Sequence, residues 1–168
     1  MPPRIFTTAD GLLPVDLAHC GLDHLTAAQR LFNSDPSHYD SAGYLAHIGI
    51  ELLFKGWLLE TTGRFEGTHN LGALHSQLVS LAAAPTLDDQ SLNVLTLLDQ
   101  YESLRYPNRK NPTEVGRGHW SAIEALVGLL CLSMPPSIER ELGNVAFGHK
   151  AGRVLMKKKI ENGSGESV

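Results

Sequence analysis

Apolar residues recur every three to four positions through most of the chain, which is the spacing of one face of an α-helix. Glycine, proline and polar turns divide this pattern into segments, and the sequence shows no sustained alternation typical of a β-strand. We therefore predict an all-α protein. Its helices are expected at residues 16–32, 39–62, 69–81, 87–104 and 120–132, with one more after Ile138.

The segment 39–62 has the strongest helical pattern in the chain. It is apolar almost all round, which predicts a helix in the middle of a bundle. Gly43, Gly49 and Gly56 recur within it at intervals of six and seven residues. Since a glycine inside a helix costs up to ~1 kcal/mol relative to alanine, these positions indicate close helix packing or a functional site.

The two ends of the chain differ from its helical body. Residues 1–15 contain three prolines and a glycine, and we expect an irregular N-terminal arm there. The helical bundle is expected to occupy residues 16–150. Residues 151–168 are basic at first and then rich in Gly, Ser and Glu, which is typical of a flexible tail.

Length and charge limit the classes of protein to be considered. A chain of 168 residues is long enough for one domain with a substantial core. Its formal net charge of −4 gives no general basic surface for nucleic acid, so any contact with RNA or a nucleotide would be local. No signal-peptide pattern follows Met1, and the most apolar stretch, residues 48–59, is too short to span a bilayer. We expect a cytoplasmic protein without a membrane segment, in which Cys20 and Cys131 are reduced, buried thiols.

Glu51 and Lys55 introduce two charges into the otherwise apolar segment 39–62. They are four residues apart on one helix and can pair directly, with His47 a further four residues earlier on the same face. One interpretation is a structural ion pair at the edge of the core. The other is a polar wall of a cleft that holds an anionic or nucleotide ligand, because burying charges costs desolvation energy.

Thr68 and His69 open the helix expected at 69–81. In the simpler interpretation Thr68 is the N-cap and His69 a partly exposed residue of the first turn. In the alternative, the N-terminus of this helix binds an anion and His69 serves as a ligand or an acid–base group.

Arg105 and Tyr106 end the helix expected at 87–104, where Pro107 stops it. An arginine beside an aromatic ring can hold a phosphate and stack on a base. An arginine at this place can equally complement the helix dipole and bond the last carbonyl groups.

In this order and spacing, three pieces of the chain resemble the HEPN domain family of helical bundles associated with nucleotides and RNA. They are a Glu-x-x-x-Lys pattern within residues 46–56, Thr-His-Asn-Leu at residues 68–71, and Arg-Tyr-Pro at residues 105–107. The resemblance implies an antiparallel four- to five-helix bundle, commonly a homodimer, with a cleft where polar residues converge. It also implies that active members are metal-independent ribonucleases, which use an arginine followed after four to six residues by a histidine.

The chain departs from that ribonuclease pattern. The six-residue offset from Arg105 is Asn111, and an asparagine cannot transfer a proton as a histidine does at neutral pH. Arg64 and His69 have the right spacing, but they lie across a loop in the wrong part of the family pattern, and we interpret that match as coincidence.

Our leading hypothesis is therefore a non-catalytic HEPN-like module that binds a nucleotide, RNA or a protein partner in a toxin–antitoxin or defence system, as a homodimer and with a nucleotidyltransferase-type partner. One alternative is a divergent metal-independent ribonuclease using Arg105 with Asn111, or Arg64 with His69; another is a structural adaptor bundle. No spacing typical of zinc or di-iron sites is present, and we expect no metal and no cofactor. The candidate ligand-binding residues are His47, Glu51, Lys55, Thr68, His69, Arg105 and Tyr106.

Overall fold

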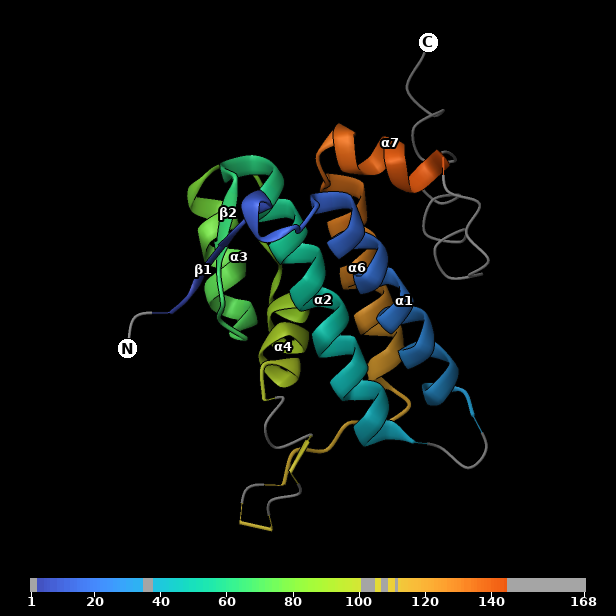
Figure 1. Ribbon diagram of the computed structural model, residues 1–168. Helices are drawn as coiled ribbons and strands as arrows, with labels where there is room; N and C mark the ends of the chain where they lie inside the picture. The colour runs from blue at the N-terminus through green and yellow to red at the C-terminus, as the bar shows by residue number, and fades with distance from the viewer. Residues whose placement is uncertain (1–2, 35–37, 101–104, 107–108, 111, 145–168) are drawn as a thin grey trace.

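Two long helices, α1 (Pro14–Phe32) and α2 (Tyr39–Thr62), run antiparallel through the molecule and form its most extensive helix pair (Figure 1). The computed structural model describes residues 3–34, 38–100, 105–106, 109–110 and 112–144. Helix α1 begins with Pro14 at its first position, where the missing N–H costs nothing. Helix α2 ends at Thr62 and is capped by Gly63, which has a positive φ of 74° and donates its N–H to the Leu59 carbonyl oxygen.

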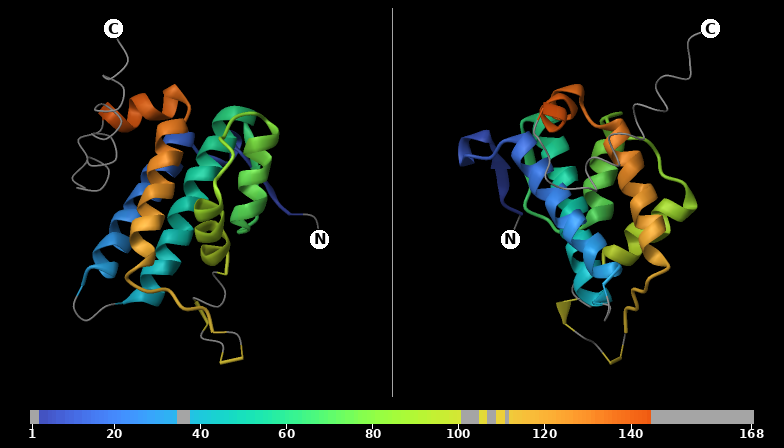
Figure 2. Two further views of the ribbon diagram at one scale, coloured as in Figure 1. Left: turned by 180° about the vertical axis from the view of Figure 1, so that it is seen from behind. Right: turned by 90° about the vertical axis from the view of Figure 1, so that its right-hand side faces the viewer.

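In the described part of the chain, four shorter α-helices pack around this pair. Helices α3 (Leu71–Ser80) and α4 (Asp89–Leu98) pack against α2, and α4 also packs against α6 (His119–Ser133). Seen from behind, α6 lies alongside α1 and α2 (Figure 2). Helix α7 (Pro136–Asn144) lies across one end of the bundle and packs against α1. The predicted all-α fold and antiparallel bundle are confirmed.

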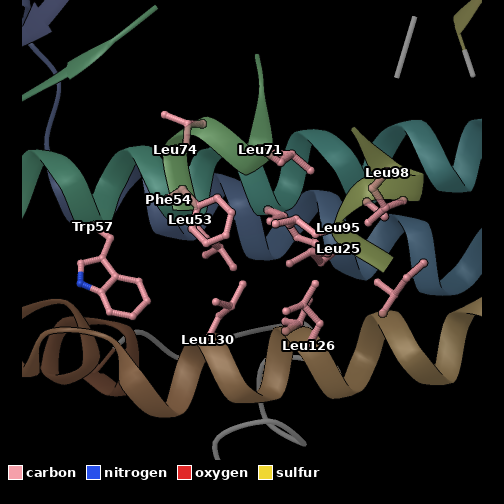
Figure 3. Packing of buried hydrophobic residues seen from close by; sticks show 14 of the residues in the cluster. Leu25, Leu53, Phe54, Trp57, Leu71, Leu74, Leu95, Leu98, Leu126 and Leu130 are labelled. Atoms are coloured by element: carbon pink, nitrogen blue, oxygen red, sulfur yellow. The ribbon is translucent and has the colours of Figure 1, made fainter. Parts of the chain in front are cut away.

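The hydrophobic core lies between α2 and α6 and is closed at its sides by α1, α3 and α4. Figure 3 shows Trp57, Phe54 and Leu53 of α2 pointing toward Leu126 and Leu130 of α6. These five side chains are at most 1% exposed. Burying an aromatic or leucine side chain contributes roughly 1.5–3 kcal/mol, so this layer holds the two sides of the bundle together.

Close contact between α1 and α2 explains two of the glycines in α2. A Cβ atom on Gly49 would lie 2.6 Å from Leu25 Cγ and 2.9 Å from the Gly21 carbonyl oxygen. One on Gly56 would lie 2.7 Å from the Pro14 carbonyl oxygen. The backbones of the two helices therefore approach closely only because these positions carry no side chain.

A two-stranded antiparallel sheet corrects the prediction of an irregular arm and of a loop after Gly63. Strand β1 (Ile5–Thr7) pairs with β2 (Arg64–Glu66), with Phe6 opposite Phe65. The rings of Phe6 and Phe65 stack with centroids 5.3 Å apart. Such pairing joins segments far apart in the chain, and strands of three residues are too short to show a period-two pattern.

Several helix boundaries also differ from the sequence prediction. The helix expected from residue 69 begins at Leu71, with Asn70 rather than Thr68 as its N-cap. The helix expected at 87–104 is observed as α4, which ends at Leu98; residues 101–104 lie outside the described part, as do residues 145–168 with the expected tail.

Two further findings concern Cys20 and the hydrophobicity of the helices. Cys20 is exposed rather than buried, because it lies on the solvent side of α1. Among the described helices, none combines the length and hydrophobicity that crossing a membrane requires.

Candidate functional site

The carboxylate of Glu51 is the centre of a buried polar cluster on α2. Glu51 is 4% exposed and Lys55, one turn later, is 6% exposed. The Lys55 ammonium donates to Glu51 Oε1, so the predicted ion pair is confirmed. Lys55 Nζ also lies 5.6 Å from the centroid of the Phe65 ring, which covers it on the side of β2.

His47 joins this cluster from one turn earlier, as the spacing predicts. Its ring is fully buried, with Nε2 3.2 Å from Glu51 Oε2 and Nδ1 2.8 Å from the Leu98 carbonyl oxygen. A carbonyl and an ionised carboxylate only accept hydrogen bonds, and a neutral imidazole donates from one nitrogen alone. The two ring nitrogens of His47 therefore face two acceptors, the Glu51 carboxylate and the Leu98 carbonyl oxygen. Through Leu98, His47 also ties α2 to the C-terminal end of α4.

His69 reaches the same carboxylate from the loop between β2 and α3. Its Nδ1 lies 3.1 Å from Oε1 and 3.0 Å from Oε2 of Glu51, while 55% of its side chain is exposed to solvent. Glu51 thus accepts hydrogen bonds from three side chains, and His69 is the member that links the buried cluster to the surface.

These contacts set the charge of Glu51. Burial of the side chain raises the pKa of the carboxyl group, but hydrogen bonds from His47, Lys55 and His69 and the charge of Lys55 outweigh it. The net effect lowers the pKa of Glu51 from 4.5 to about 2. The carboxylate is therefore ionised and fully engaged at neutral pH.

The N-terminus of α3 is occupied by side chains of the protein itself. Asn70 Oδ1 accepts from the Ala73 N–H at 2.6 Å. The Asp99 carboxylate accepts from the Leu71 N–H at 2.7 Å and from the Gly72 N–H at 3.3 Å. An external anion would have to displace Asp99, so the idea of an open anion site at this helix start is not supported. The hydroxyl of Thr68 only accepts from the Asn70 N–H, at 3.1 Å.

A pocket of about 470 Å³ lies beside His69. Its walls are Pro3, residues 66–70 and Asp99. It therefore joins the N-terminal arm, the β2–α3 loop and the end of α4 at one place on the surface. The lining offers an imidazole, a hydroxyl, a carboxamide and two carboxylates.

Arg105 and Tyr106 do not join this site. Within the described residues, no hydrogen bond or ion pair links Arg105 to the Glu51 cluster; its guanidinium lies 5.0 Å from the centroid of the adjacent Tyr106 ring. Tyr106 is 62% exposed. Arg64 lies in β2 opposite Thr7, and Asn111 lies outside the described residues.

Sequence reasoning missed Asp99, Glu66 and Pro3. Asp99 offered a signal, because an acidic residue at the C-terminal end of a helix is unfavourable with the helix dipole and is expected to serve another group. Pro3 and Glu66 enter the site only through the pairing of β1 with β2. Among the described residues, no group of three His, Cys, Asp or Glu side chains is arranged to hold a metal ion.

Comparison with known families gives one match. The family model described as the HEPN domain matches residues 16–126, about two thirds of the chain. These residues contain Glu51, His69 and Asp99, whereas β1 and α7 lie outside them. Comparison with curated proteins gave no match, and neither did comparison with solved structures.

Proposed function

This chain belongs to the HEPN domain family, and we propose that it is a non-catalytic binding module that takes a nucleotide, free or within single-stranded RNA, in the pocket beside His69. The observation that carries the proposal is the Glu51 cluster. Glu51 holds the half-exposed imidazole of His69 at the rim of a pocket large enough for a nucleotide. The charges of Glu51 and Lys55 pair with each other inside the protein.

The chemistry of the pocket favours the base or ribose over the phosphate. Lys55 is buried and paired with Glu51, and the N–H groups of α3 are taken by Asp99, so neither is available to a phosphate. Glu66, Thr68 and Asn70 instead present acceptors and donors of the kind that bond base edges. Within the described residues the side chain of Glu66 makes no hydrogen bond or ion pair, and its carboxylate can accept from a base amino group.

Two features support binding without catalysis. The Glu51 carboxylate accepts from three side chains at once and has a pKa of about 2, so it is a poor base at neutral pH. The window after Arg105 contains no histidine. The proposal is completed by a homodimer that works with a nucleotidyltransferase-type protein in a toxin–antitoxin or defence system, and these parts rest on the family alone. Its cytoplasmic location rests on the sequence, which shows no signal-peptide pattern after Met1.

Thermal shift with nucleotides tests this function. The chain is heated alone and with AMP, GMP, CMP, UMP or a short single-stranded RNA. We expect stabilisation by the bases with an amino group, with GMP about tenfold tighter than UMP because UMP cannot donate an amino group to Glu66. The shift should disappear in His69→Ala and persist in His38→Ala, an exposed histidine that makes no side-chain cap bond. If no member of the panel raises the melting temperature, nucleotide binding is wrong, and a protein partner becomes the better hypothesis.

The hydrogen bond between His69 and Glu51 favours one alternative, a divergent ribonuclease. A carboxylate bonded to Nδ1 orients an imidazole for proton transfer at its other nitrogen. This alternative predicts RNA cleavage in the presence of a metal chelator, lost in His69→Ala and retained in His38→Ala. Cleavage that both variants retain would come from a contaminant.

A further inference from the structure

The N-terminal segment 3–7, which we call the strap, lies outside the residues that match the HEPN family model. It contains strand β1 and runs along β2, and Pro3 forms part of the pocket wall. The other walls of the pocket come from residues 66–70 and Asp99, which all lie inside the matched residues. Most of the pocket wall therefore comes from residues that match the family model, and the rest comes from the strap, which the family model does not cover.

Pairing with β2, packing of Phe6 and an ion pair between Arg4 and Asp10 hold the strap in place. The Gly67 N–H donates to the Arg4 carbonyl oxygen at 2.7 Å, and β1 pairs with β2 over three residues. Phe6 stacks on Phe65 at 5.3 Å. A two-stranded ribbon is marginal by itself in water, and β1 has no further strand beside it in the described chain.

Gly67 allows the strap to lie close to the backbone of residue 67, because it carries no side chain. A Cβ atom at this position would lie 2.9 Å from Phe6 Cε2 and 3.2 Å from the Arg4 carbonyl oxygen. Gly67 does not have a positive φ, so an alanine there strains contacts with the strap rather than its own backbone.

The strap also reaches the buried cluster. Phe6 covers one face of the Phe65 ring, and Phe65 is 6% exposed. The Lys55 ammonium lies 5.6 Å from the centroid of that ring. Displacing the strap would therefore both remove Pro3 from the pocket and expose the ring that shields Lys55.

We propose that the strap is a closing wall of the His69 pocket: it covers one side of the pocket, and its release opens the site to solvent and weakens ligand binding. This proposal rests on the proposed function for the identity of the ligand, but its structural part can be tested without any ligand. The buried layer between α2 and α6 contains no residue of the strap, and of the strap Phe6 packs against the edge of the core.

Gly67→Ala is the test variant, with Gly118→Ala as its matched control, since a Cβ atom on Gly118 would meet nothing within 4 Å. Phe6→Ser releases the strap independently should Gly67→Ala unfold the chain. Three quantities are measured in the full chain: amide exchange at position 67 by NMR, the rate at which diethyl pyrocarbonate modifies His69, and the affinity for GMP.

We expect faster amide exchange at position 67 and faster modification of His69 in Gly67→Ala and in Phe6→Ser, with Gly118→Ala like the wild type. GMP should bind about tenfold more weakly to the strap variants, the size of effect expected from losing one wall contact of a pocket. Faster exchange at position 67 with unchanged His69 modification and unchanged GMP affinity would overturn the proposal. If the wild type does not bind GMP, the proposed ligand is wrong. The rate of His69 modification then tests the strap by itself. An unchanged rate in the strap variants would overturn the proposal that the strap closes the pocket.

Discussion

Replacing Glu51 by glutamine removes the charge on which the buried cluster depends while keeping its shape. The pKa of Glu51 is lowered from 4.5 to about 2, which corresponds to about 3 kcal/mol in favour of the ionised, folded form. The variant also leaves the ammonium of Lys55, itself 6% exposed, without its partner. Breaking a buried ion pair in this way costs roughly 3–5 kcal/mol. We therefore expect Glu51→Gln to lose about 3 kcal/mol of unfolding free energy, or about 6–12 °C in melting temperature.

The effect of pH distinguishes the charge from a general packing defect. An acid whose pKa is lower in the folded state contributes stability above its unfolded value of 4.5, and that stability is lost as the pH falls toward about 2. Urea unfolding at pH 6 should therefore show the full difference between the wild type and Glu51→Gln. At pH 3 the same difference should shrink to about 1 kcal/mol, because the unfolded wild type is already protonated.

Glu114→Gln is the control, since Glu114 is exposed and makes no hydrogen bond or ion pair within the described residues. It should change the unfolding free energy by less than about 0.5 kcal/mol at either pH. A Glu51→Gln variant that is as stable as the wild type at pH 6, or one whose deficit is the same at pH 3, would refute this account of the cluster.

Two further substitutions test how the fold positions the site. Gly49→Ala places a methyl group 2.6 Å from Leu25 Cγ and should destabilise the chain by about 1–2 kcal/mol in urea unfolding, although alanine is the better helix former. Gly118→Ala places its methyl group in open space and should not destabilise the chain. Equal stability of the two variants would argue against close packing of α1 and α2. Asp99→Ala removes the acceptor of the Leu71 N–H and should cost about 1 kcal/mol and speed amide exchange at Leu71 and Gly72. Unchanged exchange there would show that Asp99 does not hold these two N–H groups.

The helices could be predicted from the sequence because their signals are local. The apolar pattern and Gly63 define α2 to its observed ends. The ion pair of Glu51 and Lys55 was equally accessible, because residues four apart share one face of a helix. Even the glycines of α2 signalled close packing, which the α1 contacts confirm at Gly49 and Gly56.

The rest of the site depends on contacts between distant segments, which no local pattern encodes. The pairing of β1 with β2 rests on three residues a side and a ring stack, and it alone brings Pro3 to the pocket. The choice of Asn70 over Thr68 as the N-cap depends on how the chain leaves β2, since both residue types suit that position. Arg105 was one of the candidate ligand-binding residues, but the order of residues along the chain does not determine how far it lies from Glu51.

The central claim is that a nucleotide binds in the pocket between the strap, residues 66–70 and Asp99. An NMR titration of the ¹⁵N-labelled chain with GMP tests it most directly. The account predicts saturable shifts of the amide signals of residues 66–72, and their loss in His69→Ala. Shifts centred on Arg105 and Tyr106 instead, or no saturable shift at millimolar GMP, would contradict it.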